Sequence, residues 1–234
     1  MGKRLIQQRR GRGTHTYRAP SFRYKGEVKM PLQPVQGTVV DLVHCQGHSA
    51  PLMEISYHDG QKGLTVAPQG ICVGAEISVG GDVVQDGNFL SLRNIPEGTF
   101  VHNMELRPGD GGKLVRSSGS FAKILAKSDE GVLVMLPSRK EKMFSPDCRA
   151  AIGLVAGGGR PEKPFLKAGT HYKRMRARNK LYPKVCGISM NAVDHPFGGK
   201  CSHIKGRPTQ SPRSAPPGRK VGKIAPRRTG RKNR

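Results

Sequence analysis

The basic residues of this chain are concentrated at its two ends, and this distribution constrains the fold more than any other feature of the sequence. Residues 1–34 carry a formal charge of +8 and residues 156–234 carry +19, whereas residues 35–155 carry −2. The last 79 residues also contain nine prolines and eleven glycines. Such segments cannot bury enough apolar surface to offset the entropy of the chain. We therefore expect a folded centre flanked by two basic, irregular extensions that a partner orders.

The net charge of +25, from 41 Lys and Arg against 16 Asp and Glu, points to a polyanionic partner. Binding to a membrane would need an apolar span of about 18 residues or an amphipathic basic helix, and the sequence offers neither. The first residues, MGKRLIQQRRGRG, lack the apolar stretch of a signal peptide. The five cysteines include no CxxC pair and are expected to be reduced thiols. We predict a cytoplasmic nucleic-acid-binding protein without a cofactor and without membrane contact.

The centre of the chain has the pattern of short β-strands separated by turns. Runs rich in β-branched residues end at turn signals such as Asp59-Gly60, and no helical repeat is present. Strands are predicted at 37–43, 52–58, 63–67 and 75–79, and in a second set at 99–106, 120–127, 131–137 and 141–145. Small units of such strands favour closed barrels, because closure hides the sheet edges. The prediction is an all-β fold of two small barrels, residues 35–83 and 99–155, joined by an exposed link at 84–98.

The aromatic residues bear on which nucleic acid is bound. The chain has seven Phe, five Tyr and no Trp, which are too few and too scattered for a protein that stacks successive bases of a single strand. A chromatin-type DNA binder would satisfy the charge equally well, but duplex DNA readers insert a helix or ribbon, and no recognition helix is visible. Irregular arms rich in Gly and Pro suit the deep junctions of folded RNA. We therefore favour folded RNA held through its phosphates.

Two basic segments supply most of the candidate RNA contacts. RRGRG at 9–13 combines guanidinium groups, which grip phosphate with two N–H groups, and glycines that let the backbone approach closely. Alone, this motif is equally typical of a nuclear-targeting signal or a disordered tail. In residues 157–180 only Glu162 interrupts the positive charge, which is unusual for a solvated helix face. The candidates in these segments are Arg9, Arg10, Arg12, Arg18, Arg160, Lys163, Lys167, His171, Lys173, Arg174, Arg176 and Arg178.

Further cations lie in a glycine-rich segment and near the C-terminus. RPGDGGKLVRSSGS at 107–120 is not a P-loop, since Arg107 stands where a glycine is required and Leu114 where Ser or Thr is required. Its Lys113 and Arg116 are still candidates for contact with an RNA backbone. The candidates nearer the C-terminus are Arg207, Arg219, Lys220, Arg227, Arg228 and Arg231.

The stretch MNAVDHPFGG raises the question of catalysis, because Asp194 directly precedes His195. A catalytic dyad needs a carboxylate that reaches the imidazole from a fixed direction, a third reactive group and a dry pocket, and adjacent residues in a flexible arm supply none of these. We expect Asn191 and His195 to hydrogen-bond RNA, and Asp194 to orient the backbone or a basic neighbour. Gly198 and Gly199 are expected to shape a loop against phosphates. The alternative is an enzyme that acts on RNA or on a peptidyl ester.

A zinc site is a second alternative for this part of the chain. Cys186, Cys201 and His203, with His195 nearby, are potential ligands. Their spacing matches no zinc knuckle, in which paired ligands lie about two to four residues apart at each end. We expect reduced thiols in RNA-bound loops and no metal.

Four segments together carry a resemblance to a known family: PGDGGKLVRSSGSFAKILA, CRAAIGLVAGGGRPEKPFLKAG, GISMNAVDHPFGGK and APPGRKVGKIAPRRTGR. Over nearly the whole chain they resemble the L2 family of the large ribosomal subunit in its archaeal form. The resemblance implies an OB-like barrel followed by an SH3-like barrel, with long extensions and a non-enzymatic role. It also implies primary binding and stabilisation of 23S-type rRNA, contact with other large-subunit proteins, and support for tRNA binding, the peptidyl-transferase region and subunit association through an intersubunit bridge.

The resemblance also raises an alternative function, and the sequence departs from the family pattern at two positions. The alternative is direct participation of His195 in peptidyl transfer, for which the ability of imidazole to exchange protons near neutral pH is the only support in the sequence. The first departure is Cys186, which stands before Gly187 where the family usually has arginine, so the arginine contact of the family has no counterpart at this position. Phe197 likewise stands where bacterial forms have histidine.

Overall fold

The computed structural model of the chain describes residues 5–199 and 209–226. These residues form two compact units, which are described separately. The larger unit comprises Ser21–Phe165, and the smaller unit combines the described parts of Met1–Pro20 and Leu166–Arg234. Within the described ranges, no helix is long and apolar enough to cross a membrane.

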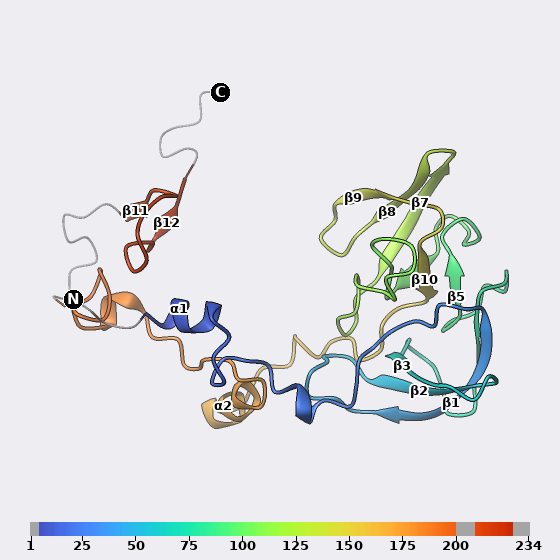
Figure 1. Cartoon of the computed structure of the whole chain (residues 1–234), viewed down its shortest axis with the longest axis horizontal. Coiled ribbons are helices and arrows are strands. Elements are labelled where there is room, and N and C mark those ends of the chain that lie inside the picture. The colour runs from blue at the N-terminus through green and yellow to red at the C-terminus, as the bar shows by residue number, and fades with distance from the viewer. Residues whose placement is uncertain (1–4, 200–208, 227–234) are drawn as a thin grey trace. The chain divides into compact units, whose positions relative to one another are not determined.

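Ten strands of the larger unit form one mixed sheet (Figure 1). In chain order they are β1 (Val35–Val43), β2 (Leu52–Tyr57), β3 (Lys62–Val66), β4 (Glu76–Val79), β5 (Phe89–Ser91), β6 (Phe100–His102), β7 (Ala122–Ser128), β8 (Gly131–Met135), β9 (Glu141–Phe144) and β10 (Arg149–Ile152). Across the sheet the order is β3-β2-β1-β4-β5-β10-β6-β7-β8-β9, and only the β4–β5 pair is parallel. The register shifts once in β1 and once in β7. The prediction of a mostly β centre is confirmed.

Every predicted strand has a counterpart, but β5 and β10 were not predicted from the sequence. They have three and four residues, too few to show a clear alternation of apolar and polar side chains. The segment 84–98, which contains β5, was expected to be an exposed link, and this expectation is wrong for residues 87–92, whereas residues 84–86 and 96–98 are exposed. Phe89, Leu90 and Leu92 are completely buried. The division of the chain into five parts remains a prediction.

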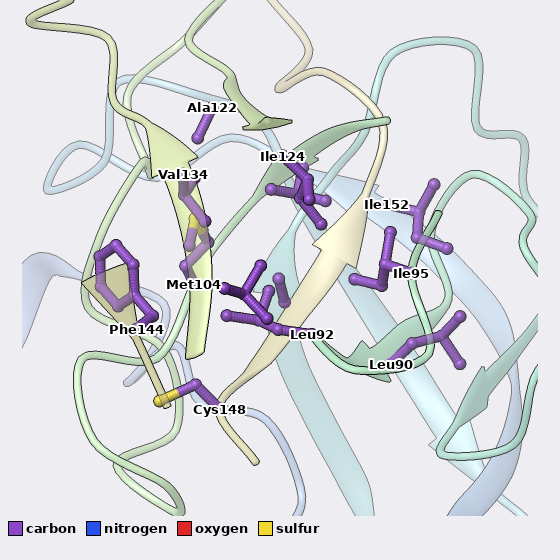
Figure 2. Packing of buried hydrophobic residues seen from close by; sticks show 13 residues of the cluster. Leu90, Leu92, Ile95, Met104, Ala122, Ile124, Val134, Phe144, Cys148 and Ile152 are labelled. Atoms are coloured by element: carbon purple, nitrogen blue, oxygen red, sulfur yellow. The ribbon is translucent and has the colours of Figure 1, made fainter. Parts of the chain in front are cut away.

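Strands β5 and β10 supply side chains to both main hydrophobic cores. Leu90 and Ala150 belong to the core shown in Figure 2, together with residues of β6 to β9. Their neighbours Phe89 and Ala151 belong to the other core, together with residues of β1, β2 and β4. Because successive side chains of a strand point to opposite faces, each of these two strands serves two cores at once.

Part of the predicted N-terminal extension packs onto this sheet. Val28 and Met30 are buried. The backbone N–H of Lys29 donates to the carbonyl of Leu64 at 3.2 Å, and that of Met30 donates to the carbonyl of Gly111 at 3.1 Å. The expectation that residues 1–34 form an extension ordered only by a partner is therefore wrong for this segment, because its two apolar side chains are spaced to face one side of an extended chain.

A buried ion pair ties three segments of the larger unit together. Glu105 is completely buried, and its Oε1 lies 2.8 Å from Nη2 of Arg149. The carboxylate also accepts hydrogen bonds from the backbone N–H groups of Gly109, Gly111 and Arg149, while Nη1 of Arg149 donates to the carbonyl of Pro31. Burial raises the pKa of Glu105, but the hydrogen bonds and the charge of Arg149 outweigh burial and hold this pKa below its ordinary value. The pair thus joins the N-terminal segment, the loop after Glu105 and β10.

We expect Glu105→Gln to lower the free energy of unfolding by about 2–4 kcal/mol, because it leaves the largely buried guanidinium of Arg149 without its counter-charge. The matched control is Glu141→Gln, which removes an exposed carboxylate on β9 and should change the free energy of unfolding by less than about 0.5 kcal/mol. Urea unfolding of the full-length chain, followed by circular dichroism, measures both. Equal effects of the two substitutions would show that the buried pair does not hold these segments together.

Candidate nucleic-acid interface

The smaller unit contains helices that bury no side chain. Its described elements are α1 (Ile6–Gly11), α2 (Ala168–Ala177), a 3₁₀ turn (Gly187–Ser189) and the parallel strands β11 (Gln210–Ser211) and β12 (Lys223–Ile224). Neither α1 nor α2 has a buried residue, and neither contains an acid. Packing of an apolar face normally stabilises helices as short as these. Helix α1 is exposed and α2 has at most half-buried residues, so this source of stability is weak in both.

Helix α2 gathers like charges on its surface. Lys173 and Arg176 are three positions apart, and Arg174 and Arg178 are four apart, which makes each pair neighbours on the helix surface. Like charges at these spacings destabilise a helix, although cations in its last turn interact favourably with the helix dipole. A polyanion along the helix would remove the repulsion. The expectation of a wholly irregular extension is wrong here, because residues 168–177 contain no proline and can form a helix despite their charge.

Asn179 ends helix α2 and connects it to the N-terminal part of the unit. Its φ of 49° lies in the left-handed region, its N–H donates to the carbonyl of Arg176 at 3.0 Å, and the N–H of Lys180 donates to the carbonyl of Met175 at 2.9 Å. This is the Schellman arrangement, in which Asn often replaces glycine. The side-chain Nδ2 of Asn179 donates to the carbonyl of Arg18 at 2.8 Å. An Asn directly after a basic run is thus the sequence signal that would have predicted the end of this helix.

The segment around Asn191 forms a loop closed by its own backbone. The N–H of Gly199 donates to the carbonyl of Met190, and the N–H of Asp194 donates to the carbonyl of Asn191, both at 2.9 Å. Gly198 is buried, and a β-carbon at this position would overlap the carbonyl of Asn191. A side chain at residue 198 is therefore incompatible with this loop.

The imidazole of His195 is held within the same loop. Its Nδ1 accepts a hydrogen bond from the backbone N–H of Phe197 at 3.0 Å, and the two rings lie 5.2 Å apart. The ring is so close to Gly187 that a β-carbon there would overlap it. A backbone N–H can only donate, so Nδ1 carries no proton, and the proton of the neutral ring is on Nε2.

This geometry opposes a catalytic dyad. In a His–Asp dyad, Nδ1–H donates to the carboxylate, and Nε2 accepts the proton of the nucleophile. In this loop Nδ1 of His195 accepts from the backbone, so Nε2–H is a donor. A donor at this position suits a hydrogen bond to a phosphate, sugar or base oxygen.

Metal ligands do not converge in the part of the chain that the structure describes. No group of three or more His, Cys, Asp or Glu side chains could hold a metal ion among these residues. Cys186 is a free, exposed thiol. Cys201 and His203 lie outside the described residues, so the expectation that they bind no zinc stays a prediction.

The candidate cations on the larger unit differ in whether their side chains are exposed or form hydrogen bonds within the protein. Lys113 and Lys163 are exposed. Arg160 donates from Nε to the hydroxyl of Ser118 at 3.1 Å. Arg116 is half-buried, with its guanidinium donating to the carbonyls of Gly112 and Val28, and burial lowers its pKa. Arg116 therefore anchors the N-terminal segment, a role that its charge alone did not indicate.

The candidates on the smaller unit are mostly accessible. The exposed ones are Arg9, Arg10, Arg12, Arg18, Lys167, Lys173, Arg176, Asn191, Asp194, Gly199 and Lys220. The half-buried ones are His171, Arg174, Arg178, His195 and Arg219. The remaining candidates, Arg207, Arg227, Arg228 and Arg231, lie outside the described residues.

Sequence similarity to known proteins shows the family to which this chain belongs. The family model for the C-terminal domain of ribosomal proteins L2 matches residues 85–218, more than half of the sequence. The chain belongs to the uL2 family. The large ribosomal subunit protein uL2 of Methanothermobacter thermautotrophicus is 49% identical over 240 residues, which cover 99% of this chain and 100% of that protein.

Two further uL2 proteins show the same extent of similarity. The protein of Methanococcoides burtonii is 49% identical over 99% of this chain, and that of Archaeoglobus fulgidus is 48% identical over 98%. In both cases the match covers at least 99% of the relative. The predicted membership in a family of large-subunit ribosomal proteins, with archaeal relatives, is confirmed.

We predict that neutral His195 is the Nε2–H tautomer. Imidazole ¹⁵N chemical shifts of the full-length chain at about pH 8.5 distinguish the two tautomers. Gly187→Ala should displace the ring and mix the tautomers, because its β-carbon overlaps the ring, whereas Gly169→Ala, where nothing lies within 4 Å, should leave the shifts unchanged. An Nδ1–H tautomer in the unsubstituted chain would contradict the hydrogen bond from Phe197.

Proposed function

We propose that this uL2 family member is a structural, non-enzymatic constituent of the large subunit of the cytoplasmic ribosome, which binds and stabilises 23S-type rRNA mainly through its two basic extensions. The observation that carries the proposal is the lack of buried and acidic residues in helices α1 and α2. They bury no residue, contain no acid and carry cations in their last turns. Such helices gain little from the protein itself and much from a partner that supplies negative charge.

The larger unit is proposed to be the scaffold. Its residues 35–155 carry a formal charge of only −2, so they contribute little net attraction to a polyanion. We propose that residues 35–83 form an OB-like barrel and residues 99–155 an SH3-like barrel. The register shifts in β1 and β7 support this, because such irregularities bend strands as closure requires.

The wider partners follow from family membership. We propose contact with other large-subunit proteins, support of tRNA binding and the peptidyl-transferase region, and a contribution to subunit association through an intersubunit bridge. Direct participation of His195 in peptidyl transfer receives less support. A general base needs an unprotonated nitrogen facing the reaction, and the unprotonated Nδ1 of His195 is occupied by the backbone N–H of Phe197.

The proposal predicts that the salt dependence of rRNA binding originates in the extensions. Replacing Lys173, Arg174, Arg176 and Arg178 by glutamine, which retains helix propensity, should reduce the slope of log K against log salt concentration by about 3 to 4. Each phosphate contact that is lost removes about 0.7 from this slope for single strands and about 0.9 for a duplex. Filter binding of the full-length chain to 23S-type rRNA at several salt concentrations gives the slope.

The matched control also removes four cations, but from the larger unit. Glutamine at Lys62, Arg139, Lys140 and Lys142, which are exposed, should change the slope by less than about 1. The division into scaffold and extensions would be refuted if the control flattened the slope as much as the helix variant does.

A further inference from the structure

A pocket of about 840 Å³ lies within the smaller unit, between its N-terminal residues and the segment that follows helix α2. Its lining includes the rings of Tyr17, His171 and Tyr182. Protein pockets that bind small ligands typically have volumes of about 300–1,000 Å³, so this pocket has room for a nucleotide. The function proposed above assigns no ligand to it.

Contacts inside the unit bring the rings together. His171 and Tyr182 have their ring centroids 4.2 Å apart, at an angle of 41°. The guanidinium of Arg10 lies 5.5 Å from the centroid of the Tyr17 ring, within the range of a cation–π interaction. The hydrogen bond from Asn179 to the carbonyl of Arg18, at 2.8 Å, connects the segment of Tyr17 to the end of helix α2. These contacts place the three rings on one pocket, and in the proposed function rRNA binding orders the segments that carry them.

The charges around the pocket select the kind of ligand. Its lining contains the cations Arg10, Lys180 and Lys184 and no Asp or Glu. A cationic ligand would be repelled, and a neutral apolar ligand would gain nothing from three positive charges. Aromatic faces together with cations are the combination that binds a base and its phosphates.

We propose that this pocket binds an unstacked nucleotide of the rRNA, with its base against the three rings and its flanking phosphates at the three cations. This inference rests on the rRNA binding proposed above and adds a site where the protein contacts a base. It is compatible with the expectation that the aromatic residues are too scattered to stack successive bases of a single strand, because the pocket would hold one nucleotide. Tyr17 and Tyr182 are far apart in the sequence but line the same pocket.

A second, smaller pocket lies beside the first and shares part of its lining. It has a volume of about 370 Å³, shares Tyr17 and Tyr182, and adds Tyr172, which is 46% exposed. Tyr172 does not line the larger pocket. Substitution of Tyr172, on helix α2, is therefore a control that removes a nearby tyrosine ring from outside the larger pocket.

The test compares Tyr182→Leu, Tyr182→Phe and Tyr172→Leu with the unsubstituted full-length chain in binding to 23S-type rRNA across salt concentrations. Tyr182→Leu should weaken binding about 5- to 100-fold at every salt concentration, with the slope unchanged, because stacking on a base releases no counterions. Tyr182→Phe keeps the stacking face and should bind within about twofold of the unsubstituted chain. Tyr172→Leu should also bind within about twofold.

Several outcomes would overturn the proposal. They are unchanged binding by Tyr182→Leu, an equal loss in Tyr182→Phe, or an equal loss in Tyr172→Leu, which would assign the base to the neighbouring pocket. A changed slope for Tyr182→Leu would show that the substitution acts through phosphate contacts. Failure of the unsubstituted chain to bind rRNA would overturn the proposed function as well, whereas normal binding by both the unsubstituted chain and Tyr182→Leu would overturn only the pocket.

Two further measurements test directly whether the pocket binds a nucleotide of the rRNA. Ultraviolet cross-linking of the unsubstituted complex, followed by mass spectrometry, should give nucleotide adducts on residues 171–184 or on Tyr17, and adducts confined to other residues would overturn the proposal. This result does not depend on how well a variant folds. The four free ribonucleoside 5′-monophosphates probe the other source of the same ligand. Tyr182-dependent binding of one of them at micromolar concentration would assign the pocket to a free nucleotide and overturn its assignment to rRNA.

Discussion

The pairing of β5 with β10 is the contact on which the larger unit depends. Leu90 pairs with Ala150 in one hydrophobic core, and the adjacent pair, Phe89 and Ala151, belongs to the other. Strands β5 and β10 supply side chains to both cores. Unfolding of either core therefore disrupts two strands that the other core needs in order to bury its apolar side chains. We infer that the two halves of the sheet unfold together. Arg149, the first residue of β10, extends this dependence to the N-terminal segment, because its guanidinium is paired with buried Glu105 and donates to the carbonyl of Pro31.

The smaller unit, unlike the larger one, gains little stability from buried apolar side chains. Its helices α1 and α2 bury no side chain, and neighbouring cations on α2 repel one another. Hydrogen bonds such as those made by Asn179 fix local geometry, but each contributes only about 1 kcal/mol. In the proposed function, the free energy that orders helices α1 and α2 comes from rRNA phosphates, as in other segments that fold on binding. The arrangement separates the part that folds by burial from the part that binds by charge.

The limits of prediction from the sequence have physical causes. The strand at 52–58 and the basic segment at 157–180 were predictable because alternation and composition are local. Strand β5 was not, because three residues show no period and their burial depends on β10, far along the chain. Charge alone could not distinguish Arg116, which donates to the carbonyl of Val28, from exposed Lys113. Likewise, no pattern in the sequence indicates that Tyr17 and Tyr182 line one pocket.

Hydrogen–deuterium exchange of the full-length chain, free and bound to 23S-type rRNA, tests most directly whether burial orders one unit and RNA the other. We predict that the amides of β5 and β10 are protected in both states, because their two cores form without RNA. The amides of helix α2 should exchange rapidly in the free protein and become protected in the complex. Equal protection of α2 in both states, or protection of β5 and β10 only in the presence of RNA, would contradict this division.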